Sequence, residues 1–107
     1  MQITNRNRKK WTILDISGNI RKNGAQQLKD LCEKMIAESR LKLAVNFKEV
    51  DFIDSIGLGA LISCNQTILA SGGQLVLVNL NENIYSLLEM TSTDKMFKIF
   101  DSEKEIA

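Results

Sequence analysis

A hydroxyl, a carboxylate and two glycines fall together where a helix is expected to begin, in the segment DSIGLG at residues 54–59. Such a helix start exposes unpaired backbone N–H groups and the positive end of the helix dipole, so it tolerates a phosphate group. We therefore take Ser55 as a candidate phosphorylation site. The alternative is structural, because Ser55 or Asp54 at this position can simply cap the helix, an interaction worth roughly 1 kcal/mol.

The composition excludes most catalytic and metal chemistry. The sequence contains no histidine, which is the usual general base, the commonest metal ligand and a member of the Ser-His-Asp triad. Cys32 and Cys64 alone cannot supply the four ligands of a structural zinc site, and each lies in an apolar pattern typical of a buried free thiol. Asp51 and Asp54 carry oxygen ligands that magnesium uses, yet aspartate is also ordinary in a turn before a helix. We predict no catalytic residues, no metal site and no structural disulfide.

The nucleotide-binding motifs are incomplete. Gly57 and Gly59 match the first two glycines of the dinucleotide fingerprint, but Ile62 occupies the third position. The sequence also has no G-x-x-x-x-G-K loop for a nucleoside triphosphate. We therefore expect no nucleotide cofactor and no enzymatic activity.

The sequence offers no general attraction for nucleic acid or membranes. Its 14 Lys and Arg residues nearly balance 13 Asp and Glu residues, which leaves a net charge of +1. No apolar run approaches the roughly 20 residues of a membrane span, and no signal-peptide pattern is present. We expect a cytoplasmic protein with no direct nucleic-acid partner and no membrane partner. One basic cluster is interpreted as ordinary solvated residues rather than as an RNA or lipid contact: Arg6, Arg8, Lys9 and Lys10.

The elements that must position residues 54–59 follow from hydrophobic periodicity. With 107 residues, 44% apolar and 25% charged, the chain fits a single domain over residues 1–107. Strand-like and helix-like hydrophobic patterns alternate along the chain. This alternation predicts an α/β fold, with a largely parallel sheet of four to five strands and about four helices. Strands are predicted at residues 11–17, 43–47, 75–78 and 97–100. Helices are predicted at residues 25–39 and 57–71, from Asn81 to Thr91, and in a short terminal turn capped by Ser102.

A row of small residues runs along the helix predicted at residues 57–71, beside its apolar stripe. A row of this kind suits close packing against another helix. That helix is either the chain's own neighbour or one contributed by a partner, and spacing alone leaves both open. The row consists of Gly57, Ala60, Cys64, Thr67 and Ser71.

The segment at residues 54–59, together with Val50 and Phe52 before it, resembles the hallmark of STAS domains. In the anti-sigma factor antagonists of this family, the serine directly after the motif aspartate is phosphorylated, and Ser55 occupies that position here. The resemblance implies a STAS-type α/β domain and extends over nearly the whole chain. Further matches lie at residues 16–18, 72–75, 87–91 and 97–100.

The resemblance implies a partner switch without catalysis. In its unphosphorylated form such a protein binds an anti-sigma factor that is also a serine kinase and so releases a sigma factor, while a PP2C-type phosphatase resets the phosphorylated form. Arg21 and Lys22 depart from the family pattern, which has an acidic residue near this point, and the reversal predicts a different kinase or a divergent partner. The alternative is a STAS scaffold or regulatory subunit of a signalling or transport complex, with Ser55 unmodified. The predicted partner-binding residues are Asp54, Ser55, Ile56, Gly57, Leu58, Gly59, Arg21 and Lys22.

Overall fold

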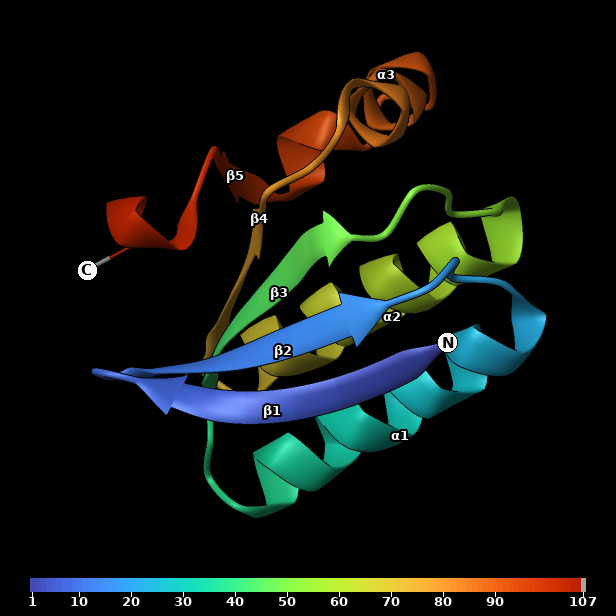
Figure 1. Cartoon of the computed structure of the whole chain (residues 1–107). Coiled ribbons are helices and arrows are strands. Elements are labelled where there is room, and N and C mark those ends of the chain that lie inside the picture. The colour runs from blue at the N-terminus through green and yellow to red at the C-terminus, as the bar shows by residue number, and fades with distance from the viewer. Residues whose placement is uncertain (107) are drawn as a thin grey trace.

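Strands and helices alternate along the chain in the computed structural model, which describes residues 1–106 (Figure 1). The strands form a 5-stranded sheet in the order β1-β2-β3-β4-β5, with β1 antiparallel to β2 and the later neighbours parallel. The predicted α/β fold with a largely parallel sheet is confirmed. The elements are β1 (Gln2–Arg8), β2 (Trp11–Ser17), α1 (Lys22–Ala37), β3 (Lys42–Glu49), α2 (Ser55–Ala70), β4 (Gln74–Val78), α3 (Glu82–Met90), η1 (Asp94–Met96), β5 (Lys98–Phe100) and η2 (Glu103–Glu105).

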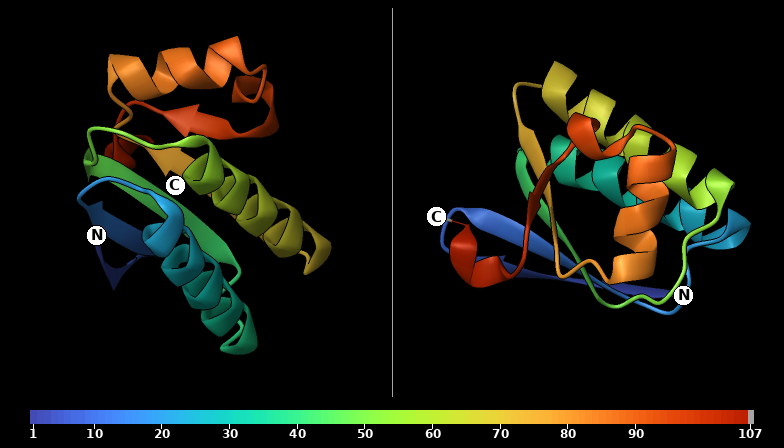
Figure 2. Two further views of the ribbon diagram at one scale, coloured as in Figure 1. Left: turned by 90° about the vertical axis from the view of Figure 1, so that its right-hand side faces the viewer. Right: turned by 90° about the horizontal axis from the view of Figure 1, so that it is seen from above.

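The helices α1 and α2 lie side by side on one face of the sheet, and α3 lies toward the β5 side (Figures 1 and 2). Each helix connects two parallel strands that are neighbours in the sheet. Because such crossovers place successive helix starts beyond the carboxyl ends of the strands, the starts of α1 and α2 come to the same edge. This arrangement brings the segment around Ser55 next to the segment that leaves β2.

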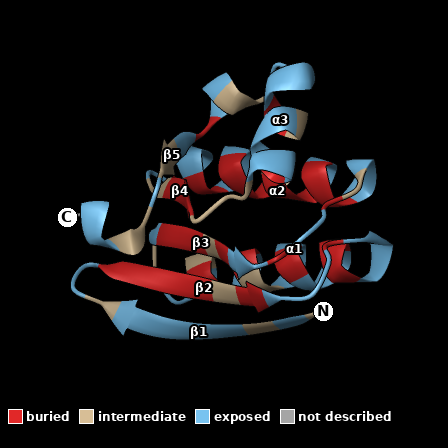
Figure 3. Ribbon diagram, turned by 45° about the horizontal axis from the view of Figure 1, so that its top comes forward, coloured by how far each residue is buried: buried red, intermediate tan, exposed pale blue. Residues whose placement is uncertain are grey.

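The central strands are buried on both faces of the sheet (Figure 3). Leu14 and Leu77 pack into the main core, which also holds residues of the three α-helices. The alternate residues Ile13 and Val76 form a second cluster on the other face, which Ile106 covers from the end of the chain. Two-sided burial explains why these strands appear in the sequence as nearly continuous apolar runs.

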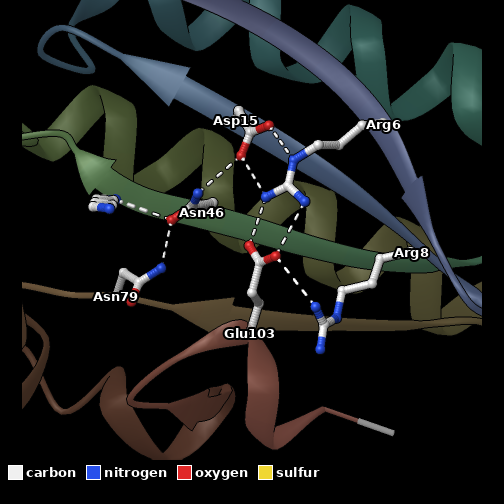
Figure 4. Close-up of polar contacts among 7 residues, drawn as sticks. Arg6, Arg8, Asp15, Asn46, Asn79 and Glu103 are labelled. Carbon is white, nitrogen blue, oxygen red and sulfur yellow. Dashed lines mark hydrogen bonds and ion pairs between the residues drawn. The ribbon is translucent and has the colours of Figure 1, made fainter.

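An ion network joins the first strand to the final segment of the chain (Figure 4). The Arg6 guanidinium donates hydrogen bonds to the Asp15 carboxylate at 2.6 and 3.2 Å and to the Glu103 carboxylate at 2.5 and 3.1 Å. Arg8 lies 3.5 Å from Glu103, and the Asn46 amide donates to Asp15 at 2.8 Å. Burial alone raises the pKa of Asp15, but the hydrogen bonds from Arg6 and Asn46 outweigh it and lower that pKa. The hydrogen bond from Arg6 likewise lowers the pKa of Glu103.

The basic cluster near the start of the chain lies in and directly after a strand that the sequence did not reveal. Residues 2–8 form an edge strand that was not predicted, and Arg6 and Arg8 in it are held by ion pairs rather than being merely solvated. Lys9 has a φ of 55° in the turn between β1 and β2. The polar sequence of β1 does not indicate a strand. These residues lie in the sheet because they pair with the neighbouring strand and take part in the network with Glu103.

Some element boundaries also differ from those predicted. The first two helices begin earlier, at Lys22 and Ser55, so Ser55 lies inside the first turn of α2. The predicted terminal helix is a single 3-10 turn, and the side chain of Ser102 makes no capping hydrogen bond there. Three α-helices and two 3-10 turns therefore account for the helical segments within residues 1–106. None of the helices in that range has the length and apolar character needed to cross a membrane.

Candidate functional site

The loops that follow β2 and β3 are bonded to one another at the carboxyl ends of the strands. The Ile20 N–H donates to the Phe52 carbonyl at 3.0 Å, and the Asp54 N–H donates to the Ile20 carbonyl at 3.1 Å. Ile20 and Ile53 also form an isolated parallel bridge beyond the regular strands, and both side chains are buried. This pairing fixes the start of α2 against the start of α1, at the edge where α/β proteins usually bind ligands and partners.

Gly57 makes this close approach possible. A Cβ atom at Gly57 would lie 2.5 Å from the Ile20 carbonyl oxygen and 2.8 Å from Ile20 Cγ2. By contrast, a Cβ atom at Gly59 would meet nothing within 4 Å. Gly57 is therefore required because a larger residue would collide with Ile20. Gly59 has no such contact and leaves an open patch on the exposed side of α2.

Asp54, rather than Ser55, caps α2. The Asp54 carboxylate accepts a hydrogen bond from the Gly57 backbone N–H at 2.7 Å, and the Asp54 carbonyl accepts the N–H of Leu58 at 2.9 Å. Ser55 is the first residue of the helix and is exposed to solvent. The capping role considered for both residues therefore belongs to Asp54. The Ser55 hydroxyl remains accessible beside the positive end of the helix.

Two basic residues lie at the neighbouring helix start. Arg21 precedes α1, and its guanidinium lies 5.6 Å from the centroid of the Phe52 ring, which is a cation–π contact. Lys22 is the first residue of α1, and both basic side chains are exposed. Phe52 itself is 48% exposed despite its size. The start of α1 and the loop before Ser55 therefore present one continuous surface of mixed apolar and charged character.

The predicted partner-binding residues divide into those on this surface and those beneath it. Ser55, Ile56 and Gly59 are exposed on α2, and Ile56 leaves 52% of its area in contact with solvent. Gly57 and Leu58 are buried, so they support the loop packing rather than face outward. We call the exposed set Arg21, Lys22, Phe52, Ser55 and Ile56 the switch surface.

A mainly apolar cleft of about 650 Å³ opens next to Ser55, between the β3–α2 loop and α3. Phe52 and Leu58 form one wall, while Leu87 and Met90 of α3 form the other. Met90 is 83% exposed, which is unusual for a large apolar side chain. An exposed apolar area beside an accessible serine is the kind of surface that a protein partner covers when it binds.

Asn81 holds the two walls of this cleft together. Its side-chain oxygen accepts the Ile84 N–H at 2.8 Å, which caps α3 as the sequence predicted. Its amide nitrogen also donates to the carbonyls of Val50 and Asp51, each at 3.2 Å. This second role was missed, because no sequence pattern shows that an N-cap residue also reaches a loop some thirty positions earlier.

The small-residue row on α2 faces α1. Gly57, Ala60 and Cys64 are buried, and the Cys64 thiol lies 3.8 Å from the Leu28 carbonyl oxygen on α1. Of the two alternatives left open by the sequence, packing against the chain's own neighbouring helix is confirmed at Cys64, whereas Thr67 and Ser71 of the row are exposed. The exposed side of α2 at Ser55 and Gly59 is a different face.

Comparison with known protein families and sequences finds matches to this chain. The family model described as STAS domain matches residues 2–106, which is almost the entire chain. The Bacillus subtilis anti-sigma-B factor antagonist is 31% identical over 88 residues, covering 80% of this chain and 78% of that protein. A Thermotoga maritima protein with the provisional name anti-sigma factor antagonist is 34% identical over 64 residues, covering 60% of this chain. The match spans only 57% of that relative, slightly more than half of its length.

Solved structures show the same arrangement of elements. The crystal structure of a Thermotoga maritima protein with this provisional name superimposes with a TM-score of 0.89 at 25% identity, covering 96% of this chain and 89% of that one. The phosphorylated form of the Bacillus cell fate determinant SpoIIAA gives a TM-score of 0.74 at 15% identity, covering 98% of this chain and 96% of that one. The second likeness shows the fold alone.

Proposed function

The chain belongs to the STAS domain family, and we propose that it is an anti-sigma factor antagonist whose binding is switched by phosphorylation of Ser55. The observation that carries the proposal is the position of Ser55, exposed on the first turn of α2 directly after the capping Asp54. The names of the Bacillus, Listeria and Paenibacillus relatives support this function over a scaffold or transport subunit.

The proposed partner of the unphosphorylated form is an anti-sigma factor that is also a serine kinase, and its capture releases a sigma factor. A PP2C-type phosphatase removes the phosphate and returns the protein to its binding form. In this scheme the chain is a regulatory binding protein and not an enzyme, residues 1–107 act as one domain, and the site of action is cytoplasmic. It needs no cofactor, no nucleic-acid contact and no membrane contact of its own.

The switch works through local charge. A phosphate on Ser55 adds about −1.5 to −2 charges near neutral pH, beside the carboxylates of Asp54 and Asp51. The positive end of α2 offsets part of this charge within the free protein, so the fold is retained. When a partner covers the switch surface, the phosphate loses water and repels acidic groups, so association weakens.

Arg21 and Lys22 decide which partner fits. Both are exposed at the edge of the switch surface, and Arg21 is held near Phe52 by the cation–π contact. A partner that covers this edge gains from acidic side chains opposite the two cations. We therefore propose that the cognate kinase differs in charge at this point from kinases that recognise an acidic residue.

Phosphate mapping tests the proposal. The protein is incubated with the anti-sigma kinase and ATP, and the modified peptide is identified by mass spectrometry. We expect phosphate on Ser55 alone and none on Ser55→Ala. The matched control is Ser71→Ala, because Ser71 is an exposed serine at the opposite end of α2 from Ser55, outside the cleft, and should not affect phosphate incorporation. Undiminished incorporation into Ser55→Ala would exclude Ser55 as the acceptor.

A further inference from the structure

The two cysteines of the chain converge between α1 and α2. Cys32 and Cys64 are free thiols and are 2% and 3% exposed. The Cys64 Sγ atom lies 3.8 Å from the Leu28 carbonyl oxygen, which is one helical turn before Cys32. Because helical side chains lean toward the N-terminus of their helix, the Cys32 thiol reaches over this same turn. The two sulfur atoms are therefore directed at one point on α1.

A small crevice connects this point with solvent. Its volume is about 40 Å³, and it lies between the two helices with both cysteines in its wall. A volume of roughly 10–15 Å³ on this measure is enough for one water molecule, so the crevice has room for a molecule as small as hydrogen peroxide. The other residues of the wall are Lys29, Glu33, Ser63 and Thr67.

The surroundings shift the pKa values of the two thiols in opposite directions. Hydrogen bonding between them is the main cause that raises the pKa of Cys32, and burial raises it further. The same hydrogen bond lowers the pKa of Cys64, and the positive charge of Lys29 adds to this effect against the opposing effects of burial and Glu33. Of the two thiols, Cys64 is therefore the one that loses its proton more readily.

We propose that Cys32 and Cys64 are a peroxide-sensitive redox pair, which closes a reversible disulfide between α1 and α2. The Cys64 thiolate attacks one oxygen of hydrogen peroxide, the O–O bond breaks, and the released hydroxide takes up a proton to form water. Cys64 is thereby oxidised to a sulfenic acid. The Cys32 sulfur then attacks the Cys64 sulfur, the S–O bond breaks, and the Cys32 proton leaves with the hydroxide as a second water. Two thiols and one peroxide yield one disulfide and two waters, and a dithiol reductant reverses the change.

This assignment differs from a structural disulfide. In a reducing compartment the resting state is the dithiol, and a disulfide there is transient and responds to oxidant. The bond joins the middle of two helices whose starts carry Arg21 and Ser55. It does not depend on the proposed function, because it forms in the isolated chain.

Peroxide treatment of the folded, fully reduced protein tests the pair. After treatment, the remaining thiols are alkylated under denaturing conditions and the peptides are mapped by mass spectrometry. We expect both thiols to be lost together, with a peptide linking Cys32 to Cys64 that dithiothreitol abolishes. Persistence of both thiols at a peroxide concentration that oxidises the denaturant-unfolded chain would overturn the proposal. A product linked only between molecules would overturn it as well.

Single variants assign the order of the two steps. In Cys32→Ala, the Cys64 sulfenic acid has no resolving thiol and should be trapped by dimedone, whereas in Cys64→Ala, Cys32 should remain a thiol. Lys29→Gln should slow thiol loss several-fold, and Lys34→Gln, an exposed lysine of α1 outside the crevice, should leave the rate unchanged. Circular dichroism verifies that each variant is folded. The disulfide measurement on the wild-type protein tests the proposal even if a variant fails to fold. Dimedone labelling of Cys32 in preference to Cys64 would contradict the assigned order.

Discussion

The Asp54 carboxylate accepts the backbone N–H of Gly57 at 2.7 Å, and this bond leaves Ser55 between them free to face solvent. We predict that Asp54→Ala lowers the free energy of unfolding by about 1 kcal/mol, because α2 loses its cap. Asp54→Asn keeps an acceptor oxygen and should stay within about 0.5 kcal/mol of the wild type. Urea unfolding measures both, with the exposed Asp51→Ala as the control. An Asp54→Ala variant as stable as the Asp51→Ala control would show that the bond contributes nothing.

The two glycines of the motif should respond in opposite ways to alanine. Gly57→Ala places a Cβ atom 2.5 Å from the Ile20 carbonyl oxygen, which forces the two loops apart and should cost about 2–3 kcal/mol of stability. Gly59→Ala meets open space within a helix and should gain about 0.5–1 kcal/mol. Thermal and urea unfolding of the matched pair check this. Equal stability changes for the two variants would contradict the packing described for Gly57.

Asn81 should prove to be both a helix cap and a link to the loop before Ser55. Asn81→Ala removes all three of its side-chain hydrogen bonds and should destabilise the protein by about 2 kcal/mol. Asn81→Asp keeps the acceptor for Ile84 but loses the amide donor to the Val50 and Asp51 carbonyls. Hydrogen exchange should then show faster exchange in residues 50–54 with α3 still protected. Unchanged exchange in that loop would mean that Asn81 acts only as a cap.

The ion network should make stability depend on acid. Because the Arg6 hydrogen bond lowers the pKa of Glu103 below its ordinary value of 4.5, the stabilisation is complete above pH 4.5 and is lost as pH falls through the lowered pKa. Glu103→Gln should cost about 1 kcal/mol at pH 7, a modest value because the Arg6 side chain is 43% exposed and solvent screens the pair. Unfolding from pH 7 to pH 3 should show the gap to wild type closing in acid. The exposed Glu89→Gln is the control, and a gap independent of pH would contradict the pairing.

The helix start around Ser55 could be predicted from sequence because its causes are local. Aspartate before a helical apolar pattern is a strong capping signal, and Gly57 marks the close approach even though its partner Ile20 is distant in the chain. The helix boundary was misplaced by two residues because Ser55 and Ile56 look like loop residues until the cap is known. Element ends are set by such single hydrogen bonds.

The edge strand and the apolar cleft could not be predicted, because both depend on contacts between distant segments. Residues 2–8 have no apolar alternation, and their place in the sheet comes from pairing with β2 and from Arg6 reaching Glu103. The cleft exists because Asn81 ties α3 to the loop after β3, which leaves Met90 exposed opposite Phe52. Periodicity identifies the buried face of α3 but does not reveal what its exposed residues border.

The account rests on charge at Ser55 controlling association, and calorimetry of the phosphorylated and unphosphorylated protein with the anti-sigma kinase measures that directly. We predict that the phosphorylated protein binds at least about tenfold more weakly, a difference of about 1.4 kcal/mol, while its melting curve matches that of the unphosphorylated protein. Ser55→Ala should bind like the unphosphorylated form, and Ser55→Asp should fall between the two because aspartate carries less charge than phosphate. Equal affinities of the phosphorylated and unphosphorylated proteins, with matched melting curves, would contradict the switch.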